Sequence, residues 1–220
     1  MNGNPRDGYA DRLVLRRLSG PLTDRLVRTS LTPNAVTLLG LGCGLAGGLA
    51  LALPWPLGAC LGMALLLASG VLDCCDGELA RLRHAESQTG HVLDVVSDTL
   101  VHLSLFAGVV LALRRDGTVV DPRVLMLLVA GALGAFAAIT WSERTEARRR
   151  RVASWQNRLL DGVLSPLTTR DWYVFPLAFA LAGRLDALLL GAAVGSHVFW
   201  LSVVVLVASA LRHEPLGRRP

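Results

Sequence analysis

Four aspartates are the residues of this chain whose types and spacing best suit chemistry. Asp73 and Asp76 lie three positions apart, and Asp94 and Asp98 lie four positions apart. Residues at these intervals project from one face of a helix. Two helices joined by a short turn can therefore bring the four carboxylates to a single point.

Such a group of carboxylates requires neutralisation, because like charges a few ångströms apart in a partly desolvated site repel strongly. Hard divalent cations such as Mg²⁺ or Mn²⁺ suit all-oxygen ligands, and two ions would balance four negative charges while leaving positions for phosphate oxygens. The spacing thus indicates a metal site for phosphoryl transfer. Gly77 and Gly90, which lack side chains, would let a nucleotide or a neighbouring helix approach the backbone.

Three other interpretations of the acidic residues are weaker. A solvated loop does not require the observed spacing. A cation or proton transporter would carry carboxylates near mid-membrane on several helices, whereas these lie at one edge of two adjacent apolar segments. A scaffold that binds anionic lipid through arginines leaves the aspartates unexplained. Glu78 and Glu86, which lie off the pattern, are interpreted as solvated charges.

The composition places the aspartates in a membrane protein. Of the 220 residues, 52% are apolar, which is too many for a soluble domain of this size. The net charge of +5 arises without lysine and could attract nucleic acid or lipid, but the long apolar runs favour lipid and exclude nucleic acid as the partner. The cysteines lack zinc-type spacing and are predicted to be small core residues: Cys43, Cys60, Cys74 and Cys75.

Apolar segments predict six membrane-spanning helices. The first begins at Thr32, a capping residue, and Pro33, which suits the first helical position. This first span ends near residue 53. The other five cover about 57–72, 91–113, 124–141, 172–182 and 185–211. Residues 11–31 mix leucine and arginine at helical spacing. We therefore predict an all-α integral membrane bundle of six transmembrane helices, preceded by an N-terminal interfacial amphipathic helix.

Arginine counts predict the orientation. Segments 1–33, 73–90, 142–171 and 212–220 contain 18 arginines, and the segments on the opposite side contain four. Positive charge is retained in the cytoplasm, so both termini and the aspartates are expected there, in a multi-pass protein of the cell membrane. The polar N-terminus lacks the apolar core of a cleavable signal peptide. The predicted parts are a cytoplasmic segment over 1–33, a catalytic domain over 34–211 and a cytoplasmic tail over 212–220.

The pattern D-x-x-D-G-x-x-A-R-x8-G-x3-D-x3-D over residues 73–98 resembles the signature of the CDP-alcohol phosphatidyltransferase family at all eight specified positions. The sequence Thr-Pro-Asn-x-x-Thr over 32–37 and the six-span layout are also similar to that family. The resemblance implies an enzyme of phospholipid biosynthesis that moves a phospho-alcohol group, such as phosphatidyl, from a CDP-alcohol to a hydroxyl acceptor and releases CMP. It also implies a homodimer.

The resemblance further implies roles for individual residues. The metal ligands for Mg²⁺ or Mn²⁺ would be Asp73, Asp76, Asp94 and Asp98. Asp98 would also be the catalytic base that takes the proton of the acceptor hydroxyl. The donor would be bound by Asp73, Asp76, Gly77, Ala80, Arg81, Asn34 and Thr37.

The substrates stay open at the level of sequence. A CDP-diacylglycerol donor with inositol phosphate, glycerol phosphate or serine as acceptor is one possibility, but residues 169–175 resemble relatives that use a soluble CDP-inositol-type donor. The basic run Arg148–Arg151 could set topology, hold anionic lipid or bind an acceptor phosphate. Arg144 and Arg170, which lie nearest the span ends, are the candidate acceptor-binding residues.

Two further features carry predictions. His197 lies within an apolar span, where an ionisable residue is a functional candidate, although packing against Ser196 or a water is the simpler expectation. Glycines recur every four residues in the first span, at Gly40, Gly44 and Gly48, which predicts close helix contact within the subunit.

Overall fold

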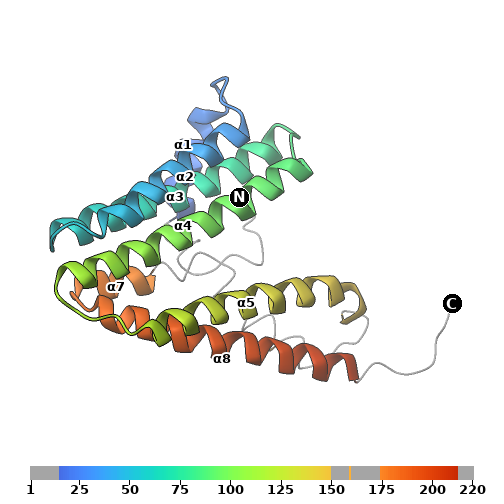
Figure 1. The fold of residues 1–220 in the computed structure, drawn as a ribbon. Helices are drawn as coiled ribbons and strands as arrows, with labels where there is room; N and C mark the ends of the chain where they lie inside the picture. The colour runs from blue at the N-terminus through green and yellow to red at the C-terminus, as the bar shows by residue number, and fades with distance from the viewer. Residues whose placement is uncertain (1–14, 150–158, 160–173, 213–220) are drawn as a thin grey trace. The chain divides into compact units, whose positions relative to one another are not determined.

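The computed structural model describes residues 15–149, 159 and 174–212, and the regular structure of these residues is entirely helical (Figure 1). The helices are α1 (Arg16–Leu26), α2 (Pro33–Ala50), α3 (Leu57–Leu82), α4 (Gln88–Arg115), α5 (Pro122–Arg149), α7 (Val174–Leu181) and α8 (Leu185–Arg212). They fall into two compact units. The first contains α1 to α4 and α7, and the second contains α5 and all but the start of α8.

Helix α2 begins where the sequence predicts. The Thr32 side chain accepts a hydrogen bond from the Ala35 backbone N–H at 3.2 Å, and Pro33 occupies the first turn. The cap satisfies one of the N–H groups that a helix start leaves without a partner, and Pro33 lacks such a group. The cap and the proline together fix the residue at which α2 begins.

Glycines bring α2 close to its two neighbours. A side chain at Gly44 would collide with Val101 of α4, and one at Gly48 would collide with the backbone of Ser104. Gly47 lies so near α3 that a Cβ atom would sit 2.9 Å from the Gly62 carbonyl oxygen. The predicted close contact within the subunit is therefore confirmed, and it holds α2 against both α3 and α4.

Helix α3 continues ten residues beyond the predicted end of the second span, through both Asp73 and Asp76. The apolar character falls after residue 72, but no proline stops the helix, and buried Cys75 and Leu79 continue its packing face. The cysteine prediction holds for Cys74 and Cys75, whereas Cys60 is exposed, and all four cysteines are free.

Helix α4 begins three residues earlier than predicted. The Ser87 side chain accepts a hydrogen bond from the Gly90 backbone N–H at 3.0 Å and so caps the helix. Polar residues follow this cap, which is why an apolar criterion placed the start at residue 91. The cap also fixes how far along α4 the acidic residues lie.

Helix α1 is shorter than the predicted segment 11–31, part of which lies outside the described residues. It packs against α3, and its buried side chains lie four residues apart: Leu15, Ser19 and Thr23. Two of these three are hydroxyls, and the partly buried Leu22 and Leu26 pack against the same core, so the face toward α3 mixes polar and apolar side chains. The interfacial location stays a prediction.

In the second unit, α5 and α8 run side by side (Figure 1). Trp200 Nε1 donates to His197 Nδ1 at 3.1 Å, and His197 Nε2 lies 3.0 Å from the Leu127 carbonyl oxygen. The indole N–H can only donate, so Nδ1 accepts and Nε2 carries the proton that reaches Leu127. His197 thus joins the two helices as a neutral side chain with two partners, which are neither Ser196 nor water.

Five described helices have the length and apolar composition to cross a membrane, namely α2, α3, α4, α5 as far as Glu146, and α8. The chain is a multi-pass membrane protein. Helix α7 has eight residues, against the roughly 20 that a crossing requires. The predicted all-α membrane class is confirmed. The described residues contain five helices that could cross a membrane, against six predicted. The predicted start of the remaining span, at residue 172, lies outside the described residues.

Candidate active site

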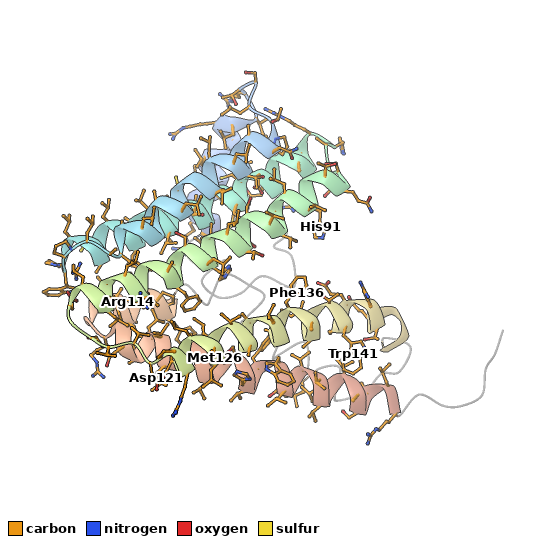
Figure 2. All side chains as sticks on the ribbon, viewed as in Figure 1. His91, Arg114, Asp121, Met126, Phe136 and Trp141 are labelled. Atoms are coloured by element: carbon orange, nitrogen blue, oxygen red, sulfur yellow. The ribbon has the colours of Figure 1, made fainter. Side chains whose placement is uncertain are left out.

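Two helices bring three of the four motif aspartates together. One carboxylate oxygen from each of Asp73, Asp76 and Asp94 lies within 4.8 Å of the others. Asp76 is buried, and Asp73 and Asp94 are partly buried. Asp98 lies one turn further along α4, is exposed, and is outside this group of three. The group lies toward the end of α4 that carries His91, and Arg114 lies at the opposite end (Figure 2).

A hydroxyl from α2 orients the buried member of this group. Thr37 Oγ1 donates to Asp76 Oδ2 at 2.6 Å, and its second possible acceptor, the Pro33 carbonyl oxygen, lies at 3.2 Å. A hydroxyl has one hydrogen, and the shorter bond goes to the carboxylate, as is usual for charged acceptors. Thr37 therefore holds the Asp76 carboxylate in one orientation.

Glu78 is not the solvated charge that the sequence suggested. Ser19 Oγ donates to Glu78 Oε1 at 3.1 Å, and Thr23 Oγ1 donates to Glu78 Oε2 at 2.7 Å. Both hydroxyls are buried, so the carboxylate attaches α1 to α3 two residues after Asp76. The i, i+4 interval of the two hydroxyls was a signal for a polar helix face. Glu86, by contrast, is exposed as predicted.

Arg83, at the end of α3, was also missed. Its guanidinium donates to backbone carbonyls of Leu26, Val27, Thr29 and Leu31, which close α1 and form the connection to α2. The carbonyls at a helix C-terminus have no partners within the helix, and a cation there is favourable. Sequence spacing gave no signal for this contact, because the partners are backbone atoms more than 50 residues away.

The other predicted donor-binding residues lie on the same three helices. The exposed Arg81 guanidinium folds back over Gly77, where a Cβ atom would lie 3.5 Å from it. Ala80 is partly buried beside them. At the start of α2, Asn34 Oδ1 would lie 3.3 Å from a Cβ on Gly90, so the first turns of α2 and α4 meet closely.

The structure does not test the predicted acceptor-binding residues. Arg144 is an exposed residue of α5 in the second unit. Arg170 and residues 150–151 of the basic run lie outside the described residues. The acceptor pocket stays a prediction.

The three-carboxylate group suits a hard divalent cation. Carboxylate oxygens are the ligands that Mg²⁺ and Mn²⁺ prefer, and an ion that contacts all three would offset their mutual repulsion. A softer metal is disfavoured, because no cysteine or histidine joins this group among the described residues. The residues present therefore fit the cation that the motif implied.

Comparison with known proteins extends this result to most of the chain. The family model described as CDP-alcohol phosphatidyltransferase matches residues 30–211, a range that includes α2 and all four aspartates. The chain belongs to the CDP-alcohol phosphatidyltransferase family. The helices that carry the carboxylate group, α3 and α4, lie wholly within the family's range.

Three curated proteins illustrate what the chain is similar to. The phosphatidylinositol phosphate synthase of Mycobacterium marinum is 35% identical over 46% of this chain and 42% of its own length. That of Mycobacterium bovis is 34% identical over 46% of this chain and 45% of its own length. The bifunctional IPC transferase and DIPP synthase of Thermococcus kodakarensis is 30% identical over 63% of this chain and 30% of its own length. The chain thus spans less than half the length of these relatives.

Proposed function

We propose that this member of the CDP-alcohol phosphatidyltransferase family is a membrane enzyme that transfers a phospho-alcohol group from a CDP-alcohol to a hydroxyl acceptor and releases CMP. The observation that carries the proposal is the group of three carboxylates, whose oxygens lie within 4.8 Å of one another on two neighbouring helices. A transporter is disfavoured because these residues gather at one end of α3 and α4 and are not spread over several helices.

In this proposal Asp73, Asp76 and Asp94 hold Mg²⁺ or Mn²⁺, with Asp98 adjacent to a pair of ions. A bound divalent cation neutralises phosphate oxygens and stabilises the charge that develops on the leaving CMP. The hydrogen bond from Thr37 to Asp76 supports the role of Asp76, because an oriented carboxylate loses less freedom when it binds an ion.

Asp98 is the general base. It accepts the proton of the acceptor hydroxyl while the hydroxyl oxygen forms a bond to the β-phosphorus of the donor. The bond between that phosphorus and the oxygen bridging to CMP breaks, and CMP leaves with the electron pair. No covalent enzyme intermediate is needed. The exposure of Asp98, outside the three-carboxylate group, supports this role because a second substrate can reach it.

The donor occupies the surface formed by the first turn of α2 and the last turns of α3. Gly77 and Ala80 leave room for the cytidine, and the exposed Arg81 guanidinium contacts the diphosphate, for which its paired N–H groups are suited. Asn34 and Thr37 complete the pocket from α2. The close approach of Asn34 to Gly90 supports its inclusion, since it places the amide next to the start of α4.

We favour a phosphatidyl donor and an inositol phosphate acceptor, because the mycobacterial relatives are named phosphatidylinositol phosphate synthases. Arg144 and Arg170 would bind the acceptor phosphate. The resemblance of residues 169–175 to relatives that use a soluble CDP-inositol-type donor supports that donor as the alternative.

The arginine asymmetry supports a location in the cell membrane with the aspartates facing the cytoplasm. Six crossings, the fifth of which ends with α7, would place the segment 1–33 and the tail 212–220 on the same side of the membrane, with the catalytic domain 34–211 between them in sequence. Helix α1 would lie in the membrane interface, and the protein would form a homodimer. These features follow from sequence pattern and family resemblance.

The proposal is tested by measuring CMP release from the purified protein with CDP-diacylglycerol or CDP-inositol as donor. Each donor is combined with inositol phosphate, glycerol phosphate or serine, in Mg²⁺, in Mn²⁺ and after chelation with EDTA. We expect release that requires a divalent ion and one acceptor class. Absence of CMP release from every combination, in protein that binds Mn²⁺, would overturn the proposed reaction.

A further inference from the structure

Arg83 gathers the connection between α1 and α2 around its guanidinium. Its Nη2 lies 2.9 Å from the Leu26 carbonyl oxygen, 3.0 Å from that of Val27 and 2.7 Å from that of Thr29, and Nη1 donates to Leu31. Two hydrogens on Nη2 serve three carbonyls, so at least one bond is shared. The guanidinium therefore contacts the connection along most of its length, from the end of α1 to the residue before the cap of α2.

This connection leads directly to the residue that orients Asp76. Thr32 caps α2 at the next position after Leu31, and Thr37 lies in the following turns of the same rigid helix. A displacement of Thr32 therefore displaces Thr37. Asp76 and Arg83 are seven residues apart on α3, which places both on the same helix face. One face of α3 thus binds the connection through Arg83 and the first turns of α2 through Asp76.

We propose that Arg83 is a positioning residue for the Asp76 carboxylate, which acts by fixing the connection before α2 and so the hydroxyl of Thr37. Its consequence for turnover rests on the proposed function, whereas its consequence for ion binding rests on the carboxylate group alone. Arg83 touches neither the ion nor the substrates in this scheme. Its effect on the site passes through Thr37.

The test is a double-mutant cycle with Mn²⁺ alone as the probe, followed by electron paramagnetic resonance of free and bound ion. Thr37→Val removes the hydroxyl with little change of shape, and we expect Mn²⁺ binding to weaken by about tenfold, in the range for a hydrogen bond to a charged group. Arg83→Gln should weaken it by several-fold. If Arg83 acts through Thr37, the double variant binds Mn²⁺ no more weakly than Thr37→Val does.

Two outcomes overturn the inference. Single effects that multiply in the double variant show that Arg83 and Thr37 act independently, and unchanged Mn²⁺ binding in Arg83→Gln shows that Arg83 does not reach the site. The matched control is Arg28→Gln, which removes the same charge from an exposed position of the same connection and should leave Mn²⁺ binding unchanged.

Arg83→Lys guards against loss of the fold. It keeps the charge and the aliphatic stem but presents one ammonium group to four carbonyls, so it should weaken Mn²⁺ binding in the same direction, and the cycle is run with it if Arg83→Gln does not fold. In turnover, either variant should raise the donor KM and leave the acceptor KM unchanged. If the wild type binds Mn²⁺ but turns over no CDP-alcohol, the proposed function fails while the cycle still decides on Arg83.

Discussion

At the scale of residues, Asp98 differs from the other three motif aspartates in its surroundings. One carboxylate oxygen from each of Asp73, Asp76 and Asp94 lies within 4.8 Å of the others, while Asp98 is exposed one turn away on α4. Carboxylates that share a cation and a carboxylate that receives a proton require different environments, the first crowded and the second open to a substrate. This difference leads to two classes of variant.

We predict that Asp98→Asn lowers turnover by about 10²–10⁴, the usual contribution of a general base, while Mn²⁺ and donor binding persist. Asp73→Asn and Asp76→Asn should instead weaken Mn²⁺ binding itself, because each removes a negative charge from a hard-cation site. Calorimetry with Mn²⁺ and CDP-alcohol separates the two classes. Near-normal turnover in Asp98→Asn would refute the base, and loss of Mn²⁺ binding as complete as in Asp73→Asn would make Asp98 chiefly a ligand.

Arg144 carries a second prediction at this scale. If it binds the acceptor phosphate, Arg144→Ala raises the acceptor KM by roughly tenfold to a hundredfold and leaves the donor KM unchanged, since one charged hydrogen bond is lost. Arg170→Ala should behave alike. Arg123→Ala, an exposed arginine at the start of α5, is the control. If both variants keep the wild-type donor KM and the wild-type acceptor KM, these arginines have a role in topology alone.

At the scale of elements, the helices around the site are held by glycine contacts and by polar attachments. Gly44, Gly47 and Gly48 let α2 approach both neighbours, and Glu78 ties α1 to α3. Apolar packing alone gives little preference between helix faces inside a membrane, because lipid tails are as apolar as the side chains. Small residues and hydrogen bonds therefore decide which faces meet.

Gly48→Ala should destabilise the first unit, because the added Cβ would overlap the backbone of Ser104, which cannot rotate away. Overpacking of this kind typically costs about 1–3 kcal/mol. Gly42→Ala, on the same helix with nothing within 4 Å of the added atom, should be neutral or slightly stabilising. Thermal melts of both variants in one detergent check the pair. Equal melting temperatures would mean that the close contact does not support the fold.

Glu78→Gln should loosen α1. The amide replaces one acceptor oxygen by a donor, so one of the two bonds from Ser19 and Thr23 is lost, at a cost of about 1.5–3 kcal/mol. Hydrogen exchange of the amides over 16–26 should accelerate while that of α8 does not. Glu86→Gln, at an exposed position, is the matched control. Unchanged exchange in α1 would show that its apolar contacts are sufficient.

At the scale of the whole molecule, orientation in the bilayer decides which side supplies the substrates. The 18 to 4 distribution of arginines predicts a cytoplasmic site. Single cysteines introduced as Asp116→Cys and Glu86→Cys test this in intact cells. An impermeant thiol reagent should label the first and not the second, after subtraction of the labelling of the four native cysteines. The reverse pattern would invert the topology.

The sequence by itself determined which residue types form the candidate site and the local helical frame that carries them. The eight motif positions name the residue types, and the helical period sets Asp73 beside Asp76 on one face without reference to the rest of the fold. The start of α2 was also predictable, because a cap and a proline act on neighbouring residues. Helix α3 extends beyond its apolar part, since a helix can continue through polar residues where neighbouring chain covers one face, and α4 begins before its apolar part at the Ser87 cap.

Only the tertiary structure decided which groups support the site. Thr37 and Asp76 are 39 residues apart, and the hydroxyls that bind Glu78 are more than 50 residues from it. Thr37 and Asp76 share no sequence period, and the i, i+4 interval of Ser19 and Thr23 marks a helix face without indicating which residue that face binds. His197 likewise has a neighbour, Trp200, on its own helix, but its second partner is a backbone oxygen of α5. Such contacts arise only when particular helix faces meet, and that choice depends on the close approach that the glycines of α2 allow and on the polar groups that must find partners away from water.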